Sequence, residues 1–223
     1  MVAGQLRDRG IRQPEVLSAM GRVLRHRFLT GTAERGSYDD RAVGIGGGQT
    51  ISQPFMVARM TEALDLPGWA ARSGLGAGSA SRAAPPMRVL DVGTGSGYQA
   101  AVLAEMGAEV ISLERHEELA EQARERLARL GHQVEIHVGD GSEGYPARAP
   151  YAGILVAAAT PRIPEPLLLQ LASGGRVAAP VGTLEQQMLT VAERTPEGLR
   201  VWELEPCVFV PLIGRFGFPD PSH

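Results

Sequence analysis

Three glycines at alternate positions follow a short apolar run. They are Gly93, Gly95 and Gly97 in the sequence Val-Gly-Thr-Gly-Ser-Gly-Tyr98. Because glycine has no side chain, a turn of this kind lets a ligand approach the backbone. The residues before the turn predict a strand and those after it a helix. In an open α/β sheet such a turn lies at the carboxyl ends of the strands, where ligands bind.

Acidic residues follow the next two predicted strands. Glu114 ends the strand expected at 109–113, and Asp140-Gly141 follows the strand expected at 134–138. We expect Glu114 to accept hydrogen bonds from two ribose hydroxyls and Asp140 to contact an adenine amino group. An exposed residue at a helix start and a plain turn dipeptide are the alternative interpretations. Together with the glycine turn, these positions favour a nucleoside site.

The glycine spacing distinguishes between nucleoside cofactors. Dinucleotide sites have the pattern G-x-G-x-x-G/A, whereas this turn is G-x-G-x-G followed by Tyr98. Asp91 precedes the first glycine by two positions, and a pyrophosphate disfavours negative charge nearby. A cationic sulfonium tolerates it. We therefore expect S-adenosylmethionine rather than NAD, with Asp91 organising the loop or holding the methionine amino group.

Alternating strands and helices position these residues. This β-α-β-α order predicts a Rossmann-like, doubly wound, mostly parallel sheet. The last strands have no helix between them and predict an antiparallel C-terminal edge. We expect strands at 87–92, 109–113, 134–138, 153–158, 176–181, 188–192, 201–204 and 207–210, and helices at 98–106, 116–130 and 165–171.

The first third of the chain has a different sequence pattern. Val16, Leu17, Met20, Val23 and Leu24 recur at helical spacing and predict a helical lead-in over residues 5–31. We expect a glycine-rich loop at 36–54, a helix at 55–66 and a flexible surface loop at 67–86. We interpret the chain as one domain with these parts: 1–66, N-terminal helices and substrate loop; 67–86, flexible loop; 87–182, cofactor-binding core; 183–223, antiparallel strands.

The composition sets limits on function. The 223 residues are 43% hydrophobic, which is enough to bury a single core. Their net charge of −3 argues against a broad basic surface that binds nucleic acid. No apolar run approaches a bilayer span and the start has no secretory pattern, so a cytoplasmic protein that binds no membrane is expected. All 22 positions that carry lysine or arginine are arginine, which excludes lysine chemistry. Cys207 is the single cysteine, and the five histidines lack metal-ligand spacing, so no metal is expected.

Residues 38–60 resemble the signature of the protein-L-isoaspartate (D-aspartate) O-methyltransferase family, through Gly-x-Gly-Gln-Thr-Ile-Ser-Gln-Pro at 46–54. Further similarity at 9–11, 25–28, 151–164, 170–176, 180–182 and 208–212 extends the resemblance over nearly the whole chain. It implies methyl transfer from S-adenosylmethionine to the free α-carboxylate of isoaspartyl and D-aspartyl residues. The partners implied are damaged proteins and peptides, repaired through a succinimide; a monomer is expected.

The resemblance also assigns residues. It implies Ser52 as the active-site hydroxyl, although by itself Ser52 reads as the N-cap of the helix that begins near Pro54. We expect substrate contacts from Ile45, Gln49 and Thr50. The loop at 44–49 is expected to close over an extended peptide. Cofactor contacts are expected from Gln53, Pro54, Val57, Asp91, Gly93, Gly95, Gly97, Glu114, Arg115, Asp140 and Gly141.

The chain departs from the family pattern at four places: Ala152-Gly153 where Asp-Ala is common, Gly44 in place of proline, Phe218 in place of tryptophan, and a longer loop at 67–86. Two other functions stay open. One is an enzyme of the same fold that methylates a small molecule or nucleic acid. The other is a non-catalytic protein that uses 36–54 as an interaction loop.

Overall fold

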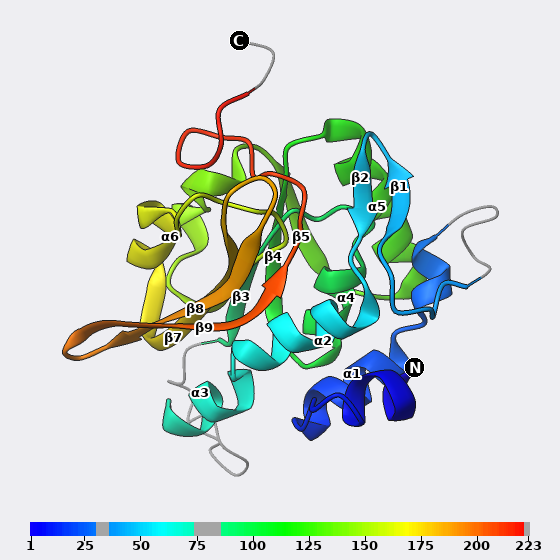
Figure 1. Ribbon diagram of the computed structural model, residues 1–223, viewed down its shortest axis with the longest axis horizontal. Helices are drawn as coiled ribbons and strands as arrows, with labels where there is room; N and C mark the ends of the chain where they lie inside the picture. Colours follow the sequence, from blue (N-terminus) through cyan, green and yellow to red (C-terminus); the bar gives the residue numbers. More distant parts are fainter. Residues whose placement is uncertain (30–35, 74–85, 221–223) are drawn as a thin grey trace.

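A seven-stranded sheet forms the centre of the computed structural model, which describes residues 1–29, 36–73 and 86–220 (Figure 1). Its strand order is β5-β4-β3-β6-β7-β8-β9. The first five strands run parallel, and β8 and β9 continue the sheet antiparallel, which confirms the predicted fold class. The strands are β3 (Arg88–Val92), β4 (Glu109–Glu114), β5 (Val134–Val138), β6 (Tyr151–Val156), β7 (Leu171–Gly182), β8 (Gln187–Thr195) and β9 (Gly198–Cys207).

Successive residues of each central strand enter separate cores on the two faces of the sheet. Val89 packs with the N-terminal helices, α4 and α5, whereas Leu90 packs with Leu167 of α6. This division follows from the alternation of side chains along a strand. The helices are α1 (Pro14–Arg22), α2 (Pro54–Ala63), α3 (Leu66–Arg72), α4 (Tyr98–Glu105), α5 (Glu117–Leu130) and α6 (Glu165–Leu169). Within the described ranges no helix is long and apolar enough to cross a membrane.

The N-terminal helical lead-in is divided into three short helices: η1 (Val2–Arg7, a π-helix), α1 and η2 (Arg25–Phe28, a 3-10 helix). The expected apolar positions of α1 are buried, but Leu24 is 47% exposed. The prediction for Leu24 is wrong because the backbone is already extended at Val23, so the helical spacing no longer applies to the next residue.

Two segments expected to be loops contain regular structure. The glycine-rich stretch forms the antiparallel hairpin of β1 (Val43–Gly46) and β2 (Gln49–Ile51). The expected flexible loop begins with α3, because Trp69 is buried and its indole donates to the Ser173 carbonyl at 3.1 Å. Residues 74–85 of that loop lie outside the described residues. Gly153 makes room for this packing, since a Cβ there would lie 3.0 Å from Leu66.

The C-terminal edge also differs in detail from the prediction. A single strand, β9, replaces the two expected at 201–204 and 207–210, and it ends at Cys207. Val210 is not in a strand; its carbonyl accepts from Ala159 N at 2.7 Å, which draws the segment toward the end of β6. The helix expected at 165–171 stops at Leu169, and Leu171 already begins β7.

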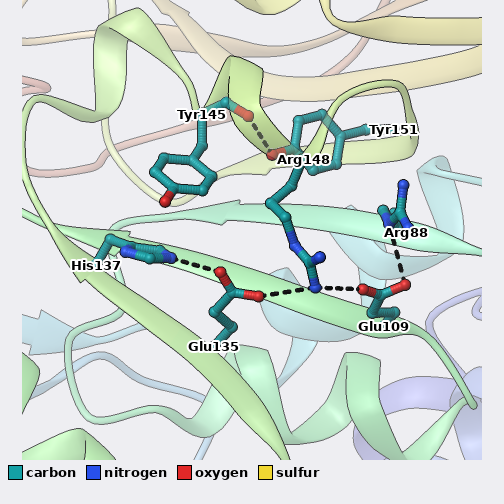
Figure 2. A network of polar contacts seen from close by, with 7 residues as sticks. All are labelled: Arg88, Glu109, Glu135, His137, Tyr145, Arg148 and Tyr151. Carbon is teal, nitrogen blue, oxygen red and sulfur yellow. Dashed lines mark hydrogen bonds and ion pairs between the residues drawn. The ribbon is translucent and has the colours of Figure 1, made fainter.

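A chain of ion pairs and one histidine hydrogen bond joins β3, β4 and β5 to the short connection before β6 (Figure 2). Two 3-10 turns, Gly141–Glu143 and Pro146–Arg148, make up the helical part of this connection. The Arg148 guanidinium contacts Glu109 at 2.7 Å and Glu135 at 2.9 Å. Arg88 continues the chain from Glu109 at 3.0 Å, and His137 continues it from Glu135 at 2.7 Å. The connection is thus tied to the sheet by charge.

Replacing Arg148 with alanine is expected to lower the melting temperature by about 2–4 °C, which corresponds to about 1 kcal/mol for a chain of this size. The loss leaves Glu109 and Glu135 without their shared cation. Arg215→Ala is a matched control, because that side chain is 75% exposed and lies 3.7 Å from Glu143. Thermal unfolding at low salt measures both, and a melting temperature unchanged in Arg148→Ala contradicts the prediction.

Candidate active site

A cavity of about 580 Å³ opens at the carboxyl ends of β3, β4 and β6. The strand order reverses here, because β4 and β5 lie to one side of β3 while β6 and β7 lie to the other. Ligands of open α/β sheets bind at such a switch point, and the volume suits a nucleoside and part of a second ligand. The walls come from the glycine turn, the end of β4, the junction of β2 with α2, and residues 206–213.

The glycine turn needs all three of its glycines. Gly93, Gly95 and Gly97 have φ values of 95°, 52° and 85°, which favour glycine. Gly93 and Gly95 line the cavity. Gly97 does not; it is the N-cap of α4, and a Cβ there would lie 3.0 Å from Leu127 of α5. Gly97 therefore allows the turn to pack against α5 and does not contribute to the cavity wall.

The Glu114 carboxylate is fixed in the cavity wall by two backbone amides. Its Oε2 accepts from Gly95 N at 2.9 Å and its Oε1 from His116 N at 3.1 Å. The side chain is only 6% exposed, yet it lines the cavity. Each oxygen keeps a second lone pair. The end of β4 thus presents an oriented pair of acceptors.

Asp91 lies beneath the turn and is not among the cavity-lining residues. Its Oδ2 accepts from the Ser112 hydroxyl at 2.7 Å, and Ser112 in turn bonds the Thr94 hydroxyl at 2.6 Å. Its Oδ1 is buried with no hydrogen-bond partner among the described residues. Of the two roles expected for Asp91, this geometry favours organisation of the loop.

Burial raises the pKa of Asp91 from its usual 3.8 to about 7; the Ser112 hydrogen bond opposes the shift and the charge of Glu114 adds to it. A raised folded-state pKa stabilises the fold at low pH, and this contribution is lost as pH rises from about 4 to about 7. We expect the unfolding free energy of the wild type, relative to Asp91→Asn, to fall by about 1–3 kcal/mol between pH 5 and pH 8. Urea denaturation at the two pH values measures this, and a constant difference contradicts it.

Asp140 and Gly141 differ in their position relative to the cavity. Gly141 lines the cavity, and a Cβ there would lie 2.4 Å from Val92. Asp140 Oδ1 accepts from Ser142 N at 2.8 Å, and Oδ2 accepts from Arg215 N at 2.7 Å. Asp140 is not among the cavity-lining residues, and its expected adenine contact stays a prediction. The carboxylate caps a 3-10 turn and anchors the C-terminal segment, because an aspartate readily bonds the backbone two residues ahead.

The C-terminal segment forms a wall of the cavity that the sequence analysis did not assign. Phe209, Leu212 and Ile213 line it. Arg115 also lines it, and the Arg115 guanidinium pairs with Asp220 at 2.9 Å, so Asp220 is held at the rim. The apolar run that carries this wall was visible in the sequence but was interpreted there as a strand.

Cys207 also lines the cavity, at the end of β9. Burial raises the pKa of its thiol to about 11, and the charge of Glu205 adds to the shift. The thiol is therefore protonated at neutral pH. The part of the chain that the structure describes contains no group of His, Cys, Asp and Glu side chains placed to hold a metal ion.

Ser52 lies between the hairpin and α2, and it lines the cavity. Its hydroxyl makes no hydrogen bond to any described residue. The interpretation of Ser52 as the N-cap is wrong: Gln53 is the N-cap, and the Phe55 amide donates to Asp40 at 2.9 Å. The Ser52 hydroxyl is thus available to a ligand.

The other expected residues of the hairpin region divide into two groups. Gln49 and Thr50 line the cavity with Gln53 and Val57 of the α2 start. Ile45 and Pro54 do not line it. Ile45 lies over the glycine turn, 3.3 Å from where a Cβ on Gly95 would stand, and Pro54 is buried as the first residue of α2.

A parallel sheet with an antiparallel edge, a glycine turn at the switch point and a carboxylate on the next strand define the class as S-adenosylmethionine-dependent methyltransferases of the Rossmann-like type. The family model described as Protein-L-isoaspartate(D-aspartate) O-methyltransferase (PCMT) matches residues 1–217. The chain therefore belongs to the protein-L-isoaspartate O-methyltransferase family.

Known proteins agree with this membership. The protein-L-isoaspartate O-methyltransferase of Methanoculleus marisnigri is 48% identical over 219 residues, which cover 98% of this chain and 92% of that protein. A solved protein-L-isoaspartate O-methyltransferase structure has a TM-score of 0.75 and 27% identity over 95% of this chain, which spans 64% of the solved chain. A beta-aspartate methyltransferase (PCMT) from Plasmodium falciparum in complex with S-adenosyl-L-homocysteine shares the fold, with a TM-score of 0.74 and 24% identity over 95% of this chain and 96% of that one.

Proposed function

We propose that the protein transfers a methyl group from S-adenosylmethionine to the free α-carboxylate of isoaspartyl residues, and of D-aspartyl residues, in proteins and peptides. One observation carries the proposal. A single cavity brings the fixed carboxylate of Glu114 and the unpaired hydroxyl of Ser52 together, in a chain that belongs to the isoaspartate methyltransferase family. The cavity therefore offers a nucleoside subsite and an acceptor subsite side by side.

The nucleoside subsite fits S-adenosylmethionine. Glu114 presents oriented acceptors to a ribose diol, and Gly93 and Gly95 leave the backbone open to close approach. Leu113 and Gly141 add an apolar wall suited to a base. Bound there, S-adenosylmethionine supplies a methyl group activated by a positively charged sulfur. We propose further cofactor contacts from Gln53, Val57 and Arg115, which line the same cavity.

The acceptor subsite needs no general base. A free α-carboxyl has a pKa near ~3.5, so it is ionised at neutral pH. We propose that the Ser52 hydroxyl donates to one carboxylate oxygen, which leaves the other free to attack. Gln49 and Thr50 lie beside Ser52 and would hold the flanking peptide. Alignment of this kind contributes roughly 7–11 kcal/mol in well-oriented reactions.

The sequel to methylation requires no further group from the enzyme. The backbone amide nitrogen that follows the isoaspartyl residue attacks the ester carbonyl, methanol leaves, and a succinimide ring forms. Water then opens the ring at either carbonyl and yields aspartyl or isoaspartyl product. We propose that repeated cycles repair isoaspartyl sites, and that the protein's partners are proteins and peptides that carry such damage.

Transfer of tritiated methyl to an isoaspartyl peptide, with the matched aspartyl peptide as control, tests the proposed function. We expect label on the isoaspartyl peptide alone, released as methanol in mild base because the product is an ester. Equal labelling of both peptides contradicts the proposed specificity. Labelling of neither peptide contradicts the function and favours an enzyme that acts on a small molecule or nucleic acid.

A further inference from the structure

Asp40 joins two parts of the chain that flank the acceptor subsite. Its Oδ1 accepts from Phe55 N at 2.9 Å, and its Oδ2 pairs with the Arg9 guanidinium. Phe55 is the second residue of α2, whose own N-cap residue, Gln53, provides no side-chain hydrogen bond. Asp40 therefore supplies the carboxylate that favours the start of α2, from outside the helix.

This contact closes the segment that carries the hairpin and Ser52. Asp40 precedes Phe55 by 15 positions. The hairpin β1–β2 lies between them, and Ser52 stands three residues before the bonded amide. The turn of the hairpin is glycine-rich, with Gly46, Gly47 and Gly48 all at positive φ. A contact that fixes both ends of this segment therefore limits where Ser52 can lie.

One arginine pairs with Asp40, and a second binds the backbone on either side of it. Arg9 stacks on the Phe55 ring, 3.7 Å from its centroid, while it pairs with Asp40. Arg25 is fully buried and donates to the carbonyl of Ser37, which precedes Asp40 in the sequence, at 2.7 Å. The Arg25 guanidinium also lies 5.2 Å from the ring of Tyr98, the first residue after the glycine turn.

Arg25 remains a cation at neutral pH. Burial lowers its pKa to about 10, while Tyr98, Asp40 and Tyr38 act in the opposite direction. The buried Arg25 guanidinium therefore links Ser37, which precedes the hairpin, to α4, which begins after the glycine turn. Arg25 of η2 thereby contacts Tyr98, which lines the cavity, while Arg9 contacts the start of α2 through Asp40 and Phe55.

We infer that Asp40 is a positioning residue, which holds Ser52 and the hairpin at a fixed place relative to the glycine turn. It lies outside the cavity lining and acts through the start of α2. The inference deepens the proposed function and rests on it for its kinetic consequence. Its structural consequence, an ordered hairpin, can be measured without any substrate.

Three variants separate the effect of the Asp40 acceptor oxygen from the effect of its charge. Asp40→Ala removes the acceptor for Phe55 N, whereas Asp40→Asn keeps an uncharged acceptor oxygen. Asp39→Ala is the matched control, because the neighbouring carboxylate is 64% exposed and lies 3.6 Å from Arg41. We expect kcat on the isoaspartyl peptide to fall at least about tenfold in Asp40→Ala, since small misplacements are costly. Asp40→Asn should stay within about threefold of wild type and Asp39→Ala within about twofold.

Hydrogen exchange measured by mass spectrometry supplies the second readout. In Asp40→Ala, peptides that cover residues 41–53 should exchange about tenfold faster, while those that cover 98–130 keep the wild-type rate. S-adenosylhomocysteine affinity should stay within about threefold. Unchanged exchange at 41–53, a kcat within twofold of wild type, or faster exchange in both regions would each overturn the inference. If the wild type labels no isoaspartyl peptide, the proposed function fails, but exchange still decides the role of Asp40.

Discussion

Replacing Ser52 with alanine is expected to lower the single-turnover rate of isoaspartyl methylation about 10- to 100-fold. A hydrogen bond to a charged group contributes about 1.5–3 kcal/mol, and each 1.36 kcal/mol of barrier is tenfold in rate. The hydroxyl makes no bond to any described residue, so its loss should disturb the fold little. Cofactor affinity should therefore stay within about twofold.

Ser52→Thr is the matched control, because it keeps the hydroxyl at the same position. We expect it to retain activity within about tenfold of wild type, whereas alanine does not. Rapid-quench measurement with enzyme in excess over labelled cofactor separates the chemical step from product release. A rate within twofold of wild type in Ser52→Ala contradicts the proposed role of the hydroxyl.

Replacing Glu114 with alanine is expected to weaken S-adenosylmethionine binding about 10- to 100-fold. The carboxylate is the acceptor for Gly95 N and His116 N as well as the proposed partner of the ribose. Its removal leaves two backbone amides without an acceptor, each at a cost of about 1–3 kcal/mol, and also removes the contacts to the ligand. The loss should therefore include disorder of the glycine turn.

Glu114→Gln gives a finer test. Its amide would place an NH₂ group against one of the two backbone donors, so one hydrogen bond is kept and the other becomes a donor–donor contact. We expect an affinity between those of wild type and Glu114→Ala. Calorimetric titration with S-adenosylmethionine measures all three proteins. Affinity that is unchanged in Glu114→Ala removes this residue from the proposed cofactor site.

Local patterns were sufficient to predict the centre of the fold. The continuous apolar run at 153–158 is typical of a buried parallel strand, and the strand itself, β6, lies two residues earlier, at 151–156. The glycine turn marks where the sheet binds ligands. Glu114 could be placed at the cavity because it directly ends a strand of this sheet. These predictions depend on residues close together in the sequence, where strand and turn chemistry act.

Features that depend on distant contacts could not be predicted from such patterns. The carboxylate of Asp140 accepts from the amide of Arg215, 75 positions away, and no local pattern predicts that contact. Ser52 matched an N-cap, but Gln53 has that position and the Phe55 amide donates to Asp40, which precedes the hairpin. The expected loop begins with a helix, α3, because the buried Trp69 indole donates to the Ser173 carbonyl. In each case a tertiary partner overrides the local preference.

The structure of a ternary complex with S-adenosylhomocysteine and an isoaspartyl peptide tests the central claim most directly. We predict the nucleoside against Glu114, the peptide carboxylate in the same cavity, and Ser52 Oγ within roughly 2.6–3.2 Å of one carboxylate oxygen. A nucleoside bound elsewhere, or a Ser52 hydroxyl directed away from the carboxylate with no hydrogen bond between them, would contradict it.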